Sequence, residues 1–163
     1  MNLETAELNL NELDRLAFEF FKLFAQYEYA LKAMGYGRSR NGHAEADWDR
    51  FANEVGAQVL RLETPDVKEA CDYLFRTPPK RQVWADAGHV DWATVTSQDR
   101  SAQTLFAHLR RVRNNLYHGG KFNGRWIDPD RSRELIGSSL GILRALTELD
   151  SRVAEAIEQN RLE

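Results

Sequence analysis

The sequence predicts an all-α protein, a helical bundle of about five helices. Three observations support this prediction. In several long segments the apolar residues recur at alternating spacings of three and four, which is the period of an amphipathic helix. Glycine or proline pairs separate some of these segments. No segment shows the sustained alternation of a half-buried β-strand. The length of 163 residues favours a single domain over residues 1–163.

The first predicted helix spans residues 11–34 and ends at Gly35. Its apolar stripe is formed by Leu13, Ala17, Phe20, Phe24, Tyr27, Leu31 and Met34. Phe18, Phe21 and Leu23 widen this stripe, so we expect the helix to be buried on more than one side.

Two shorter helices follow a polar loop over residues 38–45. The first spans about residues 46–62, and its apolar face is formed by Trp48, Phe51, Val55 and Val59. The second begins at Thr64-Pro65, an N-cap residue followed by a proline in the first turn, and runs to about Arg76.

The apolar residues of segment 77–96 follow neither the helical period nor the alternation of a strand, and the segment contains the helix-breaking pair Pro78-Pro79. We interpret them as a long loop with room for a short helix. We expect Trp84 and Trp92 to pack against the core or in a dimer interface. The alternative is that their rings stack on nucleic-acid bases.

Two longer helices complete the predicted bundle. Ser97 is a suitable N-cap for a helix that runs to about His118 and ends at Gly119-Gly120. Its inward positions are Leu105, Leu109, Val112 and Leu116. Asp128-Pro129 begins the last helix, which continues to about Asn160.

The composition points to a cytoplasmic protein. A single cysteine, Cys71, excludes an intrachain disulfide and suits a reducing compartment, and we expect it to pack as a small apolar residue. The N-terminus lacks the features of a signal peptide. No apolar stretch is long enough to span a bilayer, so we expect no membrane association.

Charge is distributed unevenly, although its sum is only −3. Residues 100–133 hold eight arginines and lysines against two aspartates, a net +6. Residues 1–31 hold six acidic and two basic side chains, a net −4. This pattern predicts a polarised surface. The alternative is that the charges only solvate helix faces.

The run over residues 111–122 combines Arg113, two asparagines, Tyr117, His118 and Lys121 at the end of a predicted helix. Cleaving RNA without a metal requires a group that takes the proton of the ribose 2′-hydroxyl, a cation near the phosphate and a proton donor for the departing 5′ oxygen. Histidine suits proton transfer because its unperturbed pKa lies near neutrality. Arginine stays charged and binds two phosphate oxygens at once.

Helix geometry does not bring the arginine and the histidine together. Arg113 and His118 are five residues apart, so at about 100° per residue they diverge by roughly 140° on a regular helix. Asn114 instead shares a face with His118, and Arg113 shares one with Tyr117. Either the helix loosens at its glycines, or the arginine curls around, or a second copy of the chain completes the site. The last arrangement favours a symmetric dimer.

The segment Arg113-Asn114-Asn115-Leu116-Tyr117-His118 resembles the R-x4–6-H motif of HEPN domains, including the asparagine that often follows the arginine. The long aromatic first helix and the motif's place at the end of the penultimate helix are also similar to that family. The resemblance implies a HEPN-like helical bundle, a homodimer and a metal-independent endoribonuclease. It also implies RNA as substrate, a toxin–antitoxin or antiviral phage-defence setting, and an antitoxin or defence-system protein as a candidate partner.

Carried over by position, Arg113 and His118 would be the catalytic pair, and Asn114 would orient His118 or the phosphate. Some HEPN toxins carry a tyrosine two residues after the histidine, which a partner nucleotidyltransferase modifies. This chain has Gly120 there, which argues against that mode of control.

Arg110, Tyr117 and Lys121 are the candidate substrate-binding residues. We expect no cofactor and no metal, because the histidines are scattered without metal-ligand spacing. The nearest candidate for a metal site is His43 with Glu45 and Asp47, which a polar loop explains equally well.

Two alternatives to catalysis remain open. One is a non-catalytic HEPN-like module that binds a nucleotide, RNA or a protein. The other is a structural role, in which Arg113 pairs with a carboxylate of the first helix and His118 caps its own helix.

Overall fold

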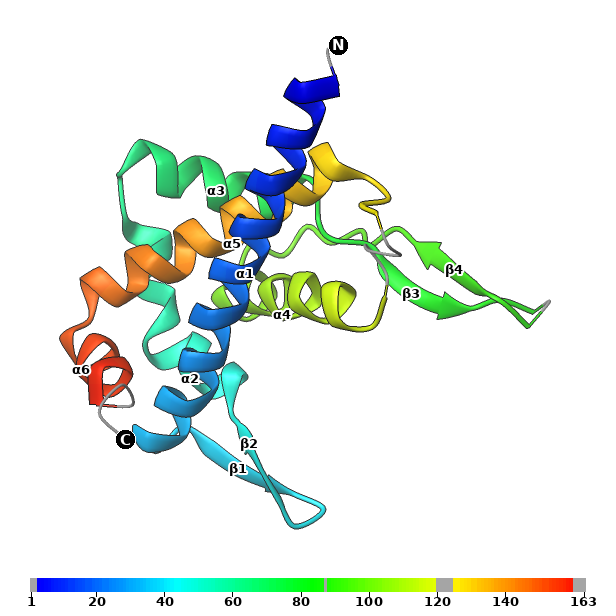
Figure 1. Cartoon of the computed structure of the whole chain (residues 1–163). Helices are drawn as coiled ribbons and strands as arrows, with labels where there is room; N and C mark the ends of the chain where they lie inside the picture. The colour runs from blue at the N-terminus through cyan, green and yellow to red at the C-terminus, as the bar shows by residue number, and fades with distance from the viewer. Residues whose placement is uncertain (1–2, 87, 120–124, 160–163) are drawn as a thin grey trace.

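The computed structural model describes residues 3–86, 88–119 and 125–159, with side-chain surroundings from residue 12 onward. Most of these residues are helical, as predicted, but two small antiparallel sheets are also present, so the prediction of an all-α bundle of about five helices is confirmed only as a mainly helical fold. The helices are α1 (Leu3–Ala33), α2 (Trp48–Glu54), the 3₁₀ helix η1 (Gly56–Arg61), α3 (Pro65–Arg76), α4 (Ala102–Tyr117), α5 (Pro129–Leu149) and α6 (Ser151–Gln159). Two antiparallel hairpins lie between them, formed by β1 (Gly37–Arg40) with β2 (His43–Ala46) and by β3 (Arg81–Trp84) with β4 (Val90–Ala93) (Figure 1).

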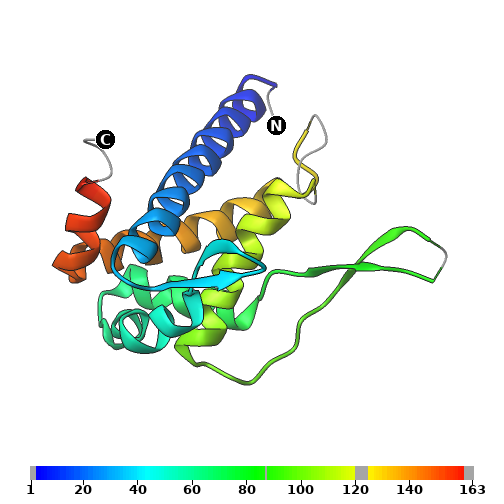
Figure 2. The same ribbon diagram turned by 90° about the horizontal axis from the view of Figure 1, so that it is seen from below.

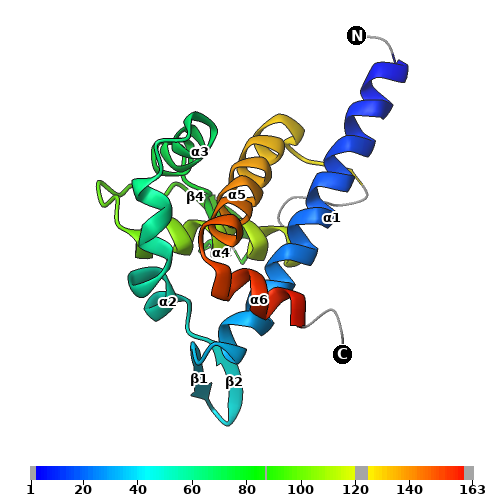
Figure 3. The same ribbon diagram turned by 90° about the vertical axis from the view of Figure 1, so that its left-hand side faces the viewer.

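Helix α5 connects the other helices. It packs against α1, α3, α4 and η1, and α6 folds back against α1. Helix α4 also packs against α2 and α3. Helix α1 crosses α5, and its N-terminal end extends beyond the other helices (Figures 1 and 3). The β3–β4 hairpin projects away from the helices (Figure 2).

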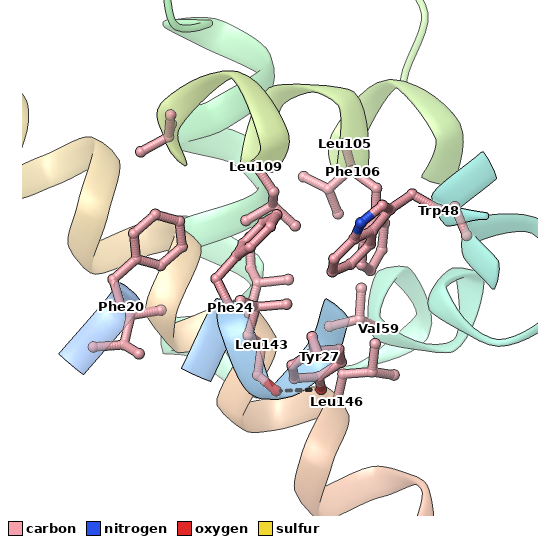
Figure 4. Close-up of a cluster of buried hydrophobic side chains, with 14 of the residues drawn as sticks. Phe20, Phe24, Tyr27, Trp48, Val59, Leu105, Phe106, Leu109, Leu143 and Leu146 are labelled. Atoms are coloured by element: carbon pink, nitrogen blue, oxygen red, sulfur yellow. Dashed lines mark hydrogen bonds between the residues drawn. The ribbon is translucent and has the colours of Figure 1, made fainter. Parts of the chain in front are cut away.

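An aromatic cluster forms the centre of the core (Figure 4). Phe20, Phe24 and Tyr27 of α1 are buried, and the rings of Phe24 and Trp48 stack with 4.9 Å between their centroids. The buried Tyr27 hydroxyl donates a hydrogen bond of 2.8 Å to the Leu143 carbonyl oxygen, so its polar atom is satisfied. Helices α4 and α5 add Leu105, Phe106, Leu109 and Leu146. This cluster holds α4, which carries the motif, firmly against the rest of the bundle.

The predicted loop over residues 38–45 is wrong, because most of this segment belongs to the β1–β2 hairpin. Arg40 pairs with His43 next to the turn. At the turn, Asn41 and Gly42 have φ values of 52° and 80°, the left-handed conformation that a two-residue hairpin turn requires.

The predicted long loop over residues 77–96 is also wrong. It contains the β3–β4 hairpin, in which Arg81 pairs with Ala93 and Trp84 pairs with Val90. The expectation that Trp84 packs against the core is wrong as well, because the side chain is 74% exposed. Strands of four residues are too short to show a sustained alternation in sequence.

Three helix boundaries differ from the prediction. Helix α4 is capped by Ser101 rather than Ser97, and the Ser101 hydroxyl accepts from the Thr104 backbone N–H. The predicted last helix breaks at Asp150, whose carboxylate accepts from the Arg152 backbone N–H and starts α6. The predicted second helix divides into α2 and η1 next to Gly56, where a Cβ atom would lie 2.6 Å from the Phe106 ring. These boundaries depend on local hydrogen bonds and packing rather than on periodicity.

The expected widening of the buried stripe of α1 is found at Leu23 but not at the two phenylalanines. Phe18 is 59% exposed and Phe21 is 42% exposed, while Leu23 is partly buried. The prediction for Cys71 is confirmed: it is buried in α3, and burial raises the pKa of its thiol to about 11.

Candidate functional site

Helix α4 places the motif at its C-terminal end. Leu105, Leu109 and Val112 are buried in the core, which fixes the rotation of the helix. His118 is the C-cap residue, and its backbone N–H donates to the Asn114 carbonyl oxygen at 2.9 Å. The next residue, Gly119, has a φ of 72°, as expected for a glycine that ends a helix.

A groove of about 370 Å³ runs along α4 beside β3. We call it the basic groove; it is lined by Arg81, Gln82, Ala107, Arg110, Arg111, Asn114, Asn115 and His118. The prediction that Asn114 and His118 share a face is therefore confirmed. Arg111 belongs to the same row, because it precedes Asn114 by three residues and His118 by seven.

Two arginines of the basic groove, Arg81 and Arg111, have no acidic partner among the described side chains. Among the side chains that the structure describes, no carboxylate lies within ion-pairing distance of Arg81 or Arg111. Burial, followed by the charge of Arg81, lowers the pKa of Arg111. Two like charges at one place repel each other, so an anion bound between them would relieve that repulsion.

The buried side chain of His108 contacts Arg111. Nδ1 of His108 lies 3.4 Å from Nη1 of Arg111. Burial, followed by the charge of Arg111, lowers the pKa of His108 to about 4. The ring is therefore neutral at pH 7 and can accept a hydrogen bond from the guanidinium group. This contact orients Arg111 without neutralising its charge.

Asn115 attaches β3 to α4. Its side chain is buried, and Nδ2 donates a hydrogen bond of 2.9 Å to the Lys80 carbonyl oxygen. Lys80 directly precedes Arg81. The bond therefore holds the start of the strand beside the helix and places Arg81 next to Arg111.

The motif arginine does not line the basic groove. The guanidinium carbon of Arg113 lies 5.5 Å from the ring centroid of Phe24 and 5.0 Å from that of Tyr117. Its Nη1 donates to Oδ1 of Asn114 at 2.9 Å. Arg113 is therefore absent from the lining of the groove that contains His118, but it contacts that groove through Asn114. Among the described side chains, no carboxylate of α1 forms the ion pair with Arg113 that the structural alternative required.

The candidate substrate-binding residues have different surroundings. Arg110 lines the basic groove but also pairs with Asp49 of α2 at 3.3 Å, so part of its charge is compensated. Tyr117 lies outside the groove, and its ring packs against Phe21 with 5.5 Å between centroids. Lys121 lies outside the described residues.

Exposed aromatic rings gather beside Arg113. Phe18, Phe21 and Tyr117 are each at least two-fifths exposed and form what we call the aromatic patch. Helix α1 contributes the two phenylalanines and α4 contributes the tyrosine. An apolar patch of this kind on a folded surface is typical of an interface.

Sequence reasoning missed Arg81, Arg111 and Asn115 as site residues. Arg111, Asn114 and His118 are spaced by three and four residues, so they lie on one face of a helix. The helix geometry that aligned Asn114 with His118 could therefore also have identified Arg111. Arg81 gave no such signal, because it reaches α4 only through the β3–β4 hairpin.

A larger hollow of about 760 Å³ lies between the end of α3 and residues 94–100. Arg100 and Arg76 in this hollow pair with Asp72 and Glu69, whereas Arg131, which also lines it, has no carboxylate partner among the described side chains and donates to the Pro78 carbonyl oxygen. We favour the basic groove as the functional site because it combines unpaired arginines with a histidine, His118. Within the described residues, no group of three or more His, Cys, Asp or Glu side chains is arranged to hold a metal ion.

Comparison of the chain with protein-family models, curated proteins and solved structures gives no match. None of the described helices combines the length and the apolar character that crossing a bilayer would require.

Proposed function

We propose that the protein is a metal-independent endoribonuclease of the HEPN type. The observation that carries the proposal is the placement of His118 in one groove with two arginines, Arg81 and Arg111, that have no acidic partner among the described residues. The arginines bind the phosphate that is cleaved and the phosphate next to it. His118, an exposed imidazole at the end of the groove, transfers a proton.

In the proposed reaction the ribose 2′-oxygen attacks the adjacent phosphorus. The bond between this oxygen and phosphorus forms, and the bond from phosphorus to the 5′ oxygen breaks. The proton that leaves the 2′-hydroxyl is balanced by a proton delivered to the 5′ oxygen. The products are a 2′,3′-cyclic phosphate and a 5′-hydroxyl, so the reaction requires no metal and no co-substrate.

The proposed site is completed by a second copy of the chain. Arg113 lies beside the aromatic patch, and His118 lies in the basic groove, so we infer that Arg113 of one copy acts with His118 of the other. A homodimer joined through the aromatic patch would bury Phe18, Phe21 and Tyr117, and it would place the end of α4 next to the interface, because His118 directly follows Tyr117. An antitoxin or a defence-system protein remains a candidate partner under this proposal.

The test is cleavage of single-stranded RNA in the presence of a chelator. The wild-type chain should cleave and leave a 2′,3′-cyclic phosphate. His118→Ala should slow cleavage by about 10²- to 10⁴-fold, the range typical for loss of a general acid–base group. His43→Ala is the matched control, because this histidine is exposed on the β1–β2 hairpin, and it should cleave like the wild type. Equal activity of His118→Ala and wild type would overturn the proposal.

A second candidate function is a non-catalytic module that binds RNA, a nucleotide or a protein. The observation in its favour is that Arg113 stacks on aromatic rings and does not line the groove that contains His118. Under this alternative, RNA binding would weaken with salt and with loss of Arg111, and no cleavage would occur under any condition.

A further inference from the structure

The β3–β4 hairpin carries an exposed tryptophan on an arm that leaves the helical body (Figures 1 and 2). Trp84 is 74% exposed. An indole ring that the fold leaves in water adds no packing to the core, whereas a bound partner would bury it. The hairpin therefore needs an explanation beyond the stability of the fold.

The register of the hairpin defines which side chains accompany Trp84. Residues directly opposite each other in an antiparallel pair lie on the same face, and alternate residues of one strand do as well. Trp84 pairs with Val90, and Gln82 pairs with Trp92, so these four side chains share one face. Val90 is also exposed, at 53%. The face is thus largely apolar and begins at Gln82.

The same face is continuous with the basic groove. Gln82 lines the groove together with Arg81 and Arg111. Arg81 alternates with Gln82 along β3, so its side chain lies on the opposite face of the hairpin, and Gln82 is the residue that links the Trp84 face to the groove. At about 3.3 Å per residue, Trp84 lies roughly 7 Å along the strand from Gln82. A strand of RNA that leaves the groove past Gln82 would meet the indole ring with a neighbouring nucleotide.

We propose that the β3–β4 hairpin is a stacking arm for single-stranded RNA, with Trp84 stacking on a base next to the phosphate held by Arg81 and Arg111. This inference rests on the proposed function, since it assigns the substrate contacts of that same groove. Charge favours RNA over a protein partner. The arginines beside the arm have no acidic partner among the described side chains, and a nucleic acid supplies both the anion and the aromatic face.

The experiment measures binding of a 2′-O-methyl RNA oligonucleotide to the full chain, so that cleavage does not interfere. Trp84→Ala should weaken binding by about 5- to 100-fold, the range for loss of one base–aromatic stack. Trp84→Phe should retain most of the affinity, because it keeps an aromatic face. Ile127→Ala removes an exposed apolar side chain outside the groove and the hairpin, and it should bind like the wild type.

An abasic oligonucleotide with the same phosphates separates stacking from charge. Trp84→Ala should bind it as the wild type does, whereas Arg81→Ala should bind it more weakly. Equal RNA affinity of Trp84→Ala and wild type would overturn the stacking arm, even if RNA is cleaved. The stacking arm would also be overturned if Trp84→Ala lost only self-association or binding to a protein. Conversely, Trp84-dependent RNA binding without any cleavage would support the arm and contradict the nuclease.

Discussion

The two sides of helix α4 use arginine in different ways. On the side that faces β3, Arg111 lies beside Arg81, and the described side chains offer neither of them a carboxylate. His118 ends the same row. On the side that faces α1, the Arg113 guanidinium lies over the rings of Tyr117 and a phenylalanine of α1. The two arginines are only two positions apart in sequence.

This comparison shows that the surroundings of an arginine decide what it is able to bind. Arg111 faces another cation, so its charge is available to an anion. Arg113 is held by aromatic rings and by the amide of Asn114, at the edge of an exposed apolar patch. One side of α4 is therefore suited to RNA and the other to a second copy of the chain. Each of the following predictions tests one of these two assignments.

The largest effect is expected on the groove side. The double substitution Arg81→Ala and Arg111→Ala should reduce affinity for 2′-O-methyl RNA by about 100-fold, because two charge-assisted contacts are lost. The slope of log affinity against log salt should become shallower by about 1.4 for single-stranded RNA. Arg61→Ala is the control, because this exposed arginine of η1 does not line the groove. An equal loss of RNA affinity in Arg61→Ala would mean that surface charge in general binds RNA and that the groove is not a defined site.

A smaller effect is expected from the contact that assembles the groove. Asn115→Ala leaves the Lys80 carbonyl oxygen without its donor and should lower the free energy of unfolding by about 1–3 kcal/mol. RNA affinity should fall too, because Arg81 loses its support. Urea unfolding measures the first effect, with Asn53→Ala, an exposed position of α2, as control. Unchanged stability and unchanged RNA affinity would contradict the role given to Asn115.

On the α1 side the expected effect is on self-association. Phe21→Ser with Tyr117→Ser should raise the dimer dissociation constant by about tenfold or more, because two aromatic side chains are removed from the interface. Sedimentation over a range of concentrations measures this constant. Leu60→Ser, an exposed apolar position of η1, should leave it unchanged. A wild-type chain that stays monomeric throughout would rule out the proposed interface.

The last prediction concerns the pH dependence of stability and the buried histidine that contacts Arg111. His108 has a pKa of about 4 in the folded chain, below its ordinary value of 6.5. Between these values the unfolded chain binds a proton that the folded chain does not, so the unfolding free energy should fall as pH drops from 6.5 towards 4. His108→Gln should show a weaker pH dependence over this window. His89→Gln, an exposed position, should retain that of the wild type. Identical profiles for all three chains would contradict a buried neutral His108.

Much of the helical architecture was predictable because it depends on local signals. The stripe of Phe20, Phe24 and Tyr27 is buried as its period indicated, and Asp128 caps α5 in front of Pro129. The β1–β2 hairpin carried a signal as well. Asn41-Gly42 is a typical type I′ turn pair, although the strands beside it are short.

The candidate site was less predictable because it depends on long-range contacts. The β3–β4 hairpin meets α4 through Asn115 and Lys80, which are 35 positions apart. No local pattern encodes such a contact, so Arg81 was missed. Helix geometry alone predicts that Arg113 and His118 point in different directions, which is why the sequence favoured a site shared between two copies.

A heterodimer of Arg113→Ala and His118→Ala chains tests whether the site is shared. The two chains would be co-expressed with different tags, purified as the heterodimer and assayed for RNA cleavage beside each mutant homodimer. If Arg113 of one copy acts with His118 of the other, one of two sites stays intact, and the heterodimer should regain about half of the wild-type activity while both homodimers stay inactive. A heterodimer as inactive as the two homodimers would contradict the shared site.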